Sequence, residues 1–159
     1  MLNDDHSRFM ALALEEAQRG AEAGEQPFGA VVVREGTVVA KARSLKVTSF
    51  DATAHAETLA IGRATRELRV RSLTGCTFYA TCEPCPMCAG AIINTEVSTL
   101  VIGARFERMR NFSPVFSVYH EYSVEKFAIL TGSHLEVISG VLTAECEALY
   151  RRARITVNG

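Results

Sequence analysis

Residues Thr81–Ile92 have the sequence TCEPCPMCAGAI, and the interpretation of the whole chain starts from this stretch. Cys85 and Cys88 are three residues apart, so in a helix that begins near Cys85 both sulfur atoms lie on one face of its first turn. Pro86 suits such a turn, because its backbone N–H groups have no partner inside the helix. The positive end of the helix dipole favours thiolate over thiol. The stretch therefore predicts a pair of metal-binding thiolates at the start of a helix.

An upstream segment with the sequence TAHAE, Thr53–Glu57, supplies an imidazole and a carboxylate. Zinc prefers sulfur and imidazole ligands in a tetrahedral arrangement. His55, Cys85 and Cys88 make three protein ligands and leave the fourth position for water, which is typical of catalytic zinc; structural zinc needs a fourth protein ligand. Glu57 is the natural acceptor of a proton from that water.

The spacing of His55 and Glu57 constrains where the segment sits in a helix. Two residues turn a regular helix by about 200°, so these side chains cannot share a face in its middle. They can reach one pocket only at the start of a helix. We therefore expect a helix over Ala54–Arg66 with Thr53 as its capping residue.

Either motif by itself is also found in proteins that have no catalytic metal. A single Cys-x-x-Cys can be redox-active or half of a zinc knuckle, and a single histidine is usually structural. A non-enzymatic zinc module that serves as a binding scaffold is a further alternative, and it predicts four protein ligands and no role for Glu57. The presence of both motifs, each at the start of an expected helix, favours a catalytic metal site.

His-x-Glu followed by Pro-Cys-x-x-Cys is the signature of zinc-dependent base deaminases, and His55–Glu57 with Pro84–Cys88 matches it. The chain resembles the cytidine deaminase-like superfamily, in its branch of guanine deaminases and tRNA-specific adenosine deaminases. The likeness runs from Gln26–Val31 (QPFGAV) through Asp51–Glu57 and the cysteine stretch to Ile138–Leu142 (ISGVL).

This resemblance implies that His55, Cys85 and Cys88 hold Zn²⁺ and that Glu57 is the catalytic proton carrier of a hydrolytic deamination. It also implies a three-layer α/β/α fold with a central five-stranded mixed sheet, commonly assembled as a dimer. Alternating strands and helices after an opening hairpin predict the same class of fold.

We expect residues 1–159 to form a single deaminase domain of the CMP/dCMP type. The expected helices are Ser7–Ala23, Ala54–Arg66, Cys85–Asn94 and Thr143–Arg154, and the expected strands are Phe28–Arg34, Thr37–Ala42, Cys76–Thr81, Thr99–Gly103 and Leu135–Ser139.

Composition limits the partners and the cellular environment expected for this domain. The formal net charge of −1 argues against a strongly basic nucleic-acid surface. No run of eighteen apolar residues is present, which excludes an ordinary membrane span. Five cysteines are an odd number, and the three outside the metal pair (Cys76, Cys82 and Cys146) are expected to be buried thiols. We therefore expect a cytoplasmic protein.

The expected substrate is a small amino-substituted heterocyclic base: a free nucleobase, a nucleoside or a related compound, with guanine first. The stretch Cys82–Cys88 looks like guanine deaminases, and the small-molecule enzymes often have Pro-Phe-Gly-Ala where Phe28 stands. The Lys-Thr-Gly-Ala-type segment usual in the tRNA enzymes is absent after Gly103–Arg105. The alternative is editing of adenosine to inosine in tRNA, which predicts salt-sensitive RNA binding.

Three residues are predicted substrate contacts: Phe28, Ser44 and Ala56. Phe28 either borders the base or belongs to the core. By resemblance, purine deaminases carry an asparagine seven residues before the position of Asp51, and here that position is Ser44. Serine has one hydroxyl group and cannot make the paired contacts of an amide. Asp51 itself is expected to order the loop.

Residues 104–134 are rich in aromatic side chains, and the sequence predicts no element within them. These side chains either line the pocket, where they can stack on a flat ring, or fill a dimer interface. They are Phe106, Phe112, Phe116, Tyr119, Tyr122 and Phe127.

Overall fold

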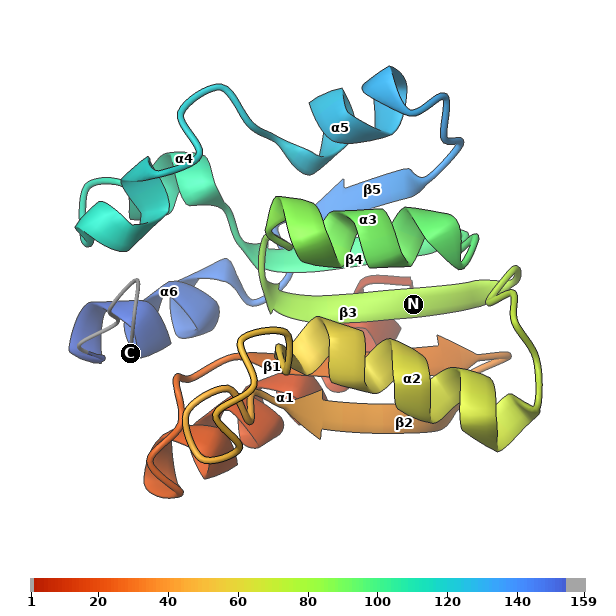
Figure 1. The fold of residues 1–159 in the computed structure, drawn as a ribbon, viewed down its shortest axis with the longest axis horizontal. Helices are drawn as coiled ribbons and strands as arrows, with labels where there is room; N and C mark the ends of the chain where they lie inside the picture. The colour runs from red at the N-terminus through yellow and green to blue at the C-terminus, as the bar shows by residue number, and fades with distance from the viewer. Residues whose placement is uncertain (1, 154–159) are drawn as a thin grey trace.

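The computed structural model describes residues 2–153, and a five-stranded sheet forms its middle layer (Figure 1). The strands are β1 (Gly29–Arg34), β2 (Thr37–Arg43), β3 (Cys76–Cys82), β4 (Thr99–Ala104) and β5 (Glu136–Ser139). Their spatial order is β2-β1-β3-β4-β5; β1 is antiparallel to β2 and β3, whereas β4 is parallel to β3 and β5. The predicted mixed sheet is confirmed.

Helices cover both faces of this sheet (Figure 1). They are α1 (Leu2–Glu22), α2 (Ala56–Leu68), α3 (Pro86–Asn94), α4 (Phe106–Met109), the 3-10 helix η1 (Pro114–Ser117), α5 (Val124–Leu130) and α6 (Thr143–Arg152). Side chains of a strand alternate between faces, so Val32 joins α2, α3 and α5 in one core while Val31 joins α1 and α6 in the other. Because both faces are covered, the central strands are almost continuously apolar.

Gly29 marks the closest approach of β1 to α1. A Cβ atom added at Gly29 would stand 1.9 Å from the carbonyl oxygen of Ala13. The N–H of Gly29 donates to Thr81 Oγ1 over 3.1 Å, and that hydroxyl group also bonds the hydroxyl group of Tyr150 over 2.7 Å. Glycine is therefore required where the strand passes beneath the helix.

The start of α2 differs from its prediction. The helix begins at Ala56 and not at Ala54, and its N-cap is His55, so the predicted cap at Thr53 is wrong. Asp51 explains the difference, because its Oδ1 atom accepts hydrogen bonds from the N–H of Thr53 (2.8 Å) and from its hydroxyl group (2.7 Å). Thr53 is thereby held in the preceding loop, which Asp51 orders as expected.

Within residues 104–134 the structure has three elements that the sequence did not predict: α4, η1 and α5. Each is a short helix, and Ser113 and Ser123 cap η1 and α5 through their side chains. The other ends shift by a few residues. In particular α1 begins at Leu2 instead of Ser7, and α6 ends at Arg152, while the predicted end at Arg154 lies outside the described residues.

Two further expectations concern membrane spans and the state of the cysteines. In residues 2–153, none of the helices has the length and apolar content that a membrane span requires. All five cysteines are free thiols, and Cys76, Cys82 and Cys146 are buried as predicted.

We expect Gly29→Ala to destabilise the protein by about 1–3 kcal/mol, because the added methyl group collides with backbone that cannot rotate away. Gly90→Ala is the matched control: a Cβ at Gly90 in α3 meets nothing within 4 Å, so this change should leave stability equal or higher. Urea denaturation of both variants measures the difference, and equal midpoints would contradict the close contact.

Candidate active site

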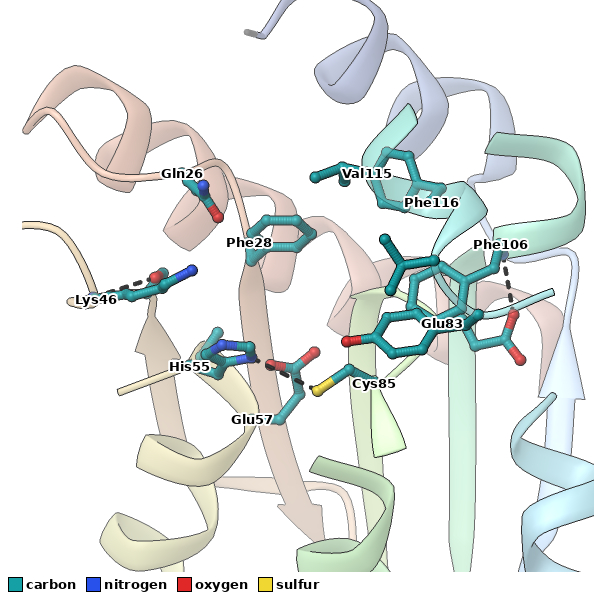
Figure 2. A pocket seen from close by; sticks show the side chains of 14 residues that line it. Gln26, Phe28, Lys46, His55, Glu57, Glu83, Cys85, Phe106, Val115 and Phe116 are labelled. Atoms are coloured by element: carbon teal, nitrogen blue, oxygen red, sulfur yellow. Dashed lines mark hydrogen bonds between the residues drawn. The ribbon is translucent and has the colours of Figure 1, made fainter. Parts of the chain in front are cut away.

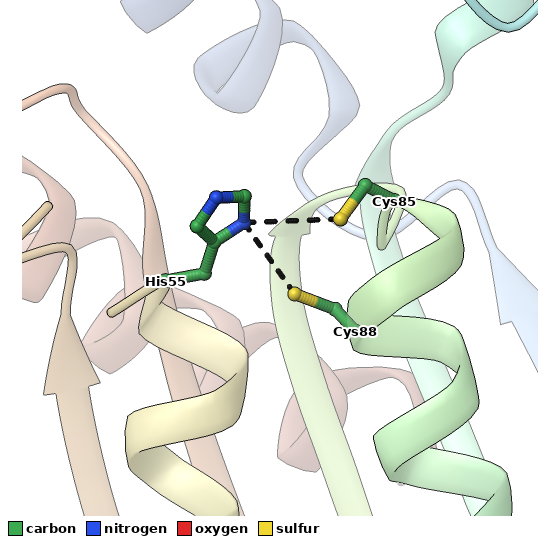
Figure 3. Close-up of side chains that lie close together, drawn as sticks. All are labelled: His55, Cys85 and Cys88. Atoms are coloured by element: carbon green, nitrogen blue, oxygen red, sulfur yellow. Dashed lines mark hydrogen bonds between the residues drawn. The ribbon is translucent and has the colours of Figure 1, made fainter. Parts of the chain in front are cut away.

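The predicted metal ligands come together at the starts of two neighbouring helices (Figure 3). One ligand atom from each of His55, Cys85 and Cys88 lies within 4.8 Å of the others. The Nδ1 atom of His55 is 3.8 Å from the sulfur of Cys85 and 3.5 Å from the sulfur of Cys88. Among the described residues, this is the one cluster of histidine, cysteine or acidic side chains with such spacing.

These distances fit a tetrahedral zinc ion. With Zn–S bonds of about 2.3 Å and Zn–N bonds of about 2.0–2.1 Å, a tetrahedral angle separates sulfur from nitrogen by roughly 3.6 Å. Both observed separations lie close to that value. No fourth protein ligand joins the cluster in residues 2–153, so a bound ion would keep a position for water.

Helix starts explain how the ligands reach one another. His55 is the N-cap of α2 and Cys85 is the N-cap of α3, and both have extended backbone conformations. Pro86 occupies the first turn of α3, as predicted. Because His55 precedes the regular helix, its side chain and that of Glu57 line the same pocket despite their spacing of two residues.

Glu57 lies beside the ligand cluster and is only 6% exposed. Its Oε2 atom is 3.6 Å from the sulfur of Cys88. Burial, together with the charge of Cys85, raises the pKa of the Glu57 carboxyl group to about 7. A hydrogen bond from Cys88, followed by one from His55, lowers the pKa of Cys85 to about 4, and the same contact with Cys85 raises the pKa of Cys88.

A pocket opens next to this cluster, and all three predicted substrate contacts line it (Figure 2). Ser44 and Ala56 line it together with the metal ligand His55. Phe28 faces the pocket and also packs against both cores, with its ring stacked on that of Tyr150 at 5.2 Å between centroids. Phe28 thus contacts the core and also lines the pocket, while its contact with a base stays a prediction.

Part of the aromatic segment forms the opposite wall of the pocket. Phe106, Phe116 and Tyr119 all line it, in agreement with the first of the two alternatives for residues 104–134. Tyr122 supports this wall from behind, because its hydroxyl group donates to the carbonyl oxygen of Pro84 over 2.6 Å. The wall is thereby fastened to the loop that presents Cys85.

Glu83 is the main structural residue that sequence reasoning missed. It is buried, and its carboxylate accepts the N–H groups of Phe106 (2.9 Å) and Val124 (3.0 Å). Arg105 lies 3.2 Å from the same carboxylate and also forms two hydrogen bonds with Glu125. A charged residue directly after a buried strand was the available signal, since a buried carboxylate must find donors.

Two polar pocket residues also escaped sequence reasoning, namely Gln26 and Lys46. Each is two positions from a predicted contact, Gln26 before Phe28 and Lys46 after Ser44. Proximity in sequence to a predicted contact was therefore the signal.

Comparison with known proteins agrees with this geometry. Residues 3–104 match the family model described as the cytidine and deoxycytidylate deaminase zinc-binding region. The chain belongs to this deaminase family. It is accordingly a zinc-dependent hydrolase that acts on the C–N bond of a cyclic amidine, and His55, Cys85 and Cys88 form a cluster able to hold the metal.

Within the family, the chain is similar to tRNA-specific adenosine deaminases and to a guanine deaminase. The tRNA-specific adenosine deaminase of Bacillus subtilis is 38% identical over 92% of this chain and 89% of its own length. A solved tRNA:A34 deaminase structure, from work on A-to-I editing at the wobble position, superposes with a TM-score of 0.76 at 36% identity, covering 89% of this chain and 98% of that one. The guanine deaminase of Bacillus subtilis is 45% identical, but over 55% of this chain and 57% of its own.

The expectation of a small-molecule, guanine-deaminase-like substrate is therefore wrong. It depended on short stretches around Phe28 and Cys82–Cys88. The sequence likeness to the guanine deaminase of Bacillus subtilis covers little more than half of either chain. A solved guanine deaminase from Nitrosomonas europaea covers 91% of this chain but is 25% identical, whereas the tRNA-specific adenosine deaminase of Bacillus subtilis is 38% identical over nearly all of both chains. The alternative prediction has the better support.

Cys88→Ala should abolish stoichiometric zinc binding and lower the melting temperature, because metal binding stabilises only the folded protein. Cys76→Ala is the control: this thiol is buried at the start of β3 and is not in the cluster, so the variant should retain its zinc. Elemental analysis of the purified proteins decides, and one zinc per chain in Cys88→Ala would contradict the ligand assignment.

Glu83→Gln should lower stability by about 1–3 kcal/mol for each buried N–H group that it leaves without an acceptor. Glu121→Gln is the control, because its exposed side chain forms a surface ion pair with Lys126 at 3.8 Å, and the change should alter stability by less than about 1 kcal/mol. Denaturant titration gives both values, and an unaffected Glu83→Gln variant would show that the buried carboxylate does not hold the pocket wall.

Proposed function

We propose that this protein is a tRNA-specific adenosine deaminase, which converts adenosine to inosine in a tRNA. The observation that carries the proposal is the nearly full-length likeness to the Bacillus subtilis enzyme of that name, at 38% identity over 92% of this chain. The solved tRNA:A34 deaminase supports it with a superposition over 89% of this chain.

The proposed reaction consumes one water and releases one ammonia. A zinc ion held by His55, Cys85 and Cys88 would acidify a bound water, so that it could attack at neutral pH. We propose that Glu57 accepts the proton of this water while the water oxygen adds to C6 of adenine. Glu57 delivers this proton to ring nitrogen N1, then takes the second water proton from the new hydroxyl group at C6 and passes it to the amine. The C6–N6 bond breaks, the carbonyl group of inosine forms at C6, and ammonia leaves.

The walls of the pocket suit a base that has left its stack. Phe28 stands on one side and Phe106 and Phe116 on the other (Figure 2), and the ring of Tyr119 stacks on that of Phe106 with 5.4 Å between centroids. A deaminase must turn its target base out of the nucleic acid, and aromatic side chains replace the stacking that the base then loses. We therefore propose that Phe28 and the neighbouring Ala56 contact the target adenine.

Residues 1–159 are proposed to form one deaminase domain that assembles as a homodimer and works in the cytoplasm. Ile129 and Leu130 on α5 support a contact between copies, because they are 80% and 82% exposed. Large apolar side chains that are this exposed next to each other are typical of interaction surfaces.

Incubation of the zinc-loaded protein with unmodified tRNA transcripts should produce inosine, detected by mass spectrometry of the digested RNA as a gain of one dalton on adenosine. Glu57→Gln should lose about 10²–10⁴-fold in turnover while it keeps its zinc, because only the proton carrier has changed. Glu67→Gln, an exposed change on the same helix, should retain full activity.

Two results would contradict the proposal. Failure of the wild-type protein to bind tRNA at low salt, together with no inosine, would rule out a tRNA substrate. Near-normal turnover of Glu57→Gln would rule out the role of this carboxylate. Binding that weakens steeply as salt rises is expected, since contacts with phosphates release counterions.

A further inference from the structure

Four polar side chains line the pocket besides the metal ligands, Glu57 and Glu83. They are Gln26, Ser44, Lys46 and Tyr119. Proteins often recognise an adenine by pairing a donor with ring nitrogen N7 and, beside it, an acceptor with the amino group at C6. With Glu57 assigned to N1 on one side of C6, the N7 edge lies on the other side of that carbon.

Only one of the four side chains presents a donor and an acceptor side by side. The ammonium group of Lys46 has no acceptor. The hydroxyl groups of Ser44 and Tyr119 each offer a single oxygen, and Ser44 Oγ already accepts the N–H of Lys46 over 3.3 Å. The planar carboxamide of Gln26 has both groups in the spacing that pairs with N7 and the amino group of adenine.

The backbone brings Gln26 to the wall on which Ser44 lies. The carbonyl oxygen of Gln26 accepts the N–H of Phe28 over 2.9 Å, which closes a tight turn around Pro27. The carbonyl oxygen of Phe28 in turn accepts the N–H of Ser44 over 3.2 Å. Gln26 is thus two residues from Phe28, whose carbonyl group is bonded to Ser44. The side chain of Gln26 is longer than that of Ser44 and extends into the same pocket (Figure 2).

The preceding residue fixes this wall further. Glu25 is buried, and its carboxylate accepts the N–H groups of Val47 (2.9 Å) and Thr48 (2.8 Å). Hydrogen bonds therefore join the segment that carries Gln26 to the loop that carries Ser44 and Lys46. A side chain on such an anchored segment can hold a base in one orientation.

We propose that Gln26 determines specificity for adenine, with its amide N–H donating to N7 and its amide oxygen accepting from the amino group at C6. This inference rests on the proposed function, because it takes adenosine as the reacting base. It assigns to Gln26 the paired amide contacts that Ser44 cannot make.

The test combines an enzyme variant with a substrate analogue. Wild-type protein and Gln26→Leu are compared on tRNA that carries adenosine or 7-deazaadenosine at the edited position. The analogue replaces N7 by C–H, so the wild type should lose about 5- to 150-fold in kcat/KM, and Gln26→Leu should lose a similar factor on ordinary adenosine. In Gln26→Leu, 7-deazaadenosine should lower kcat/KM by a far smaller factor than in the wild type, because this variant already lacks the side chain that bonds N7.

The comparison separates this contact from general damage. Any change that 7-deazaadenosine makes to the intrinsic reactivity of the ring affects both proteins equally and cancels. The role of Gln26 would be overturned if the analogue lowered kcat/KM by the same factor in Gln26→Leu as in the wild type. It would also be overturned if the wild type used both substrates equally well. In either case inosine formation would still uphold the proposed function. No inosine from the wild type on ordinary tRNA would overturn the proposed function and this inference with it.

Gln26→Glu serves as a second variant if Gln26→Leu is poorly folded. It keeps the shape and the acceptor oxygen but replaces the donating amide by a second oxygen. It should therefore also lose sensitivity to the N7 substitution, with zinc content unchanged. A Gln26→Glu protein that still distinguished the two substrates as the wild type does would overturn the assignment.

Discussion

Two helix starts must meet for this protein to have a site at all. The ligand atoms of His55, Cys85 and Cys88 lie within 4.8 Å of one another, although the histidine and the cysteines are about thirty positions apart in the chain. The sheet makes this possible, because β1 and β3 pair directly and α2 and α3 pack on the same face. An N-cap has non-helical backbone, and this lets His55 turn toward the cysteines while Glu57 occupies the first turn behind it.

The same centre depends on the part of the chain that follows the family match. The match ends at residue 104, yet Phe106, Phe116 and Tyr119 form a wall of the pocket. Glu83 connects the two parts, since it lies two residues before Cys85 and accepts N–H groups from Phe106 and Val124. The loop that presents Cys85 and the aromatic wall of the pocket therefore share one buried carboxylate. A change in the structure of either should alter the other.

The chemistry of the site could be predicted from sequence because it depends on residue types at fixed spacings. Thiolates at i and i+3 and a histidine at a helix start leave few geometric choices. Residues 104–134 were different: their helices are short, and α5 begins where Val124 donates to Glu83, a residue forty-one positions away. Such an element depends on tertiary contacts more than on local propensity, so no periodic pattern marks it. Likewise the side chain of Asp51 delayed the start of α2, an effect that helix propensity alone does not contain.

The wrong prediction of a small-molecule substrate has a physical cause in the pocket itself. Phe28 and Ala56 line the pocket, and under the proposed function they contact the base. A base presents the same ring whether it is free or part of a tRNA. Short motifs that surround the base therefore discriminate poorly between these two substrates. Binding of a tRNA adds contacts with phosphates and neighbouring nucleotides, which must come from surfaces beyond the base pocket. The sequence match to the tRNA-specific adenosine deaminase of Bacillus subtilis extends over 92% of the chain and so covers residues outside the base pocket, whereas the match to the guanine deaminase of that organism covers 55%. The longer match is for that reason the better guide to the substrate.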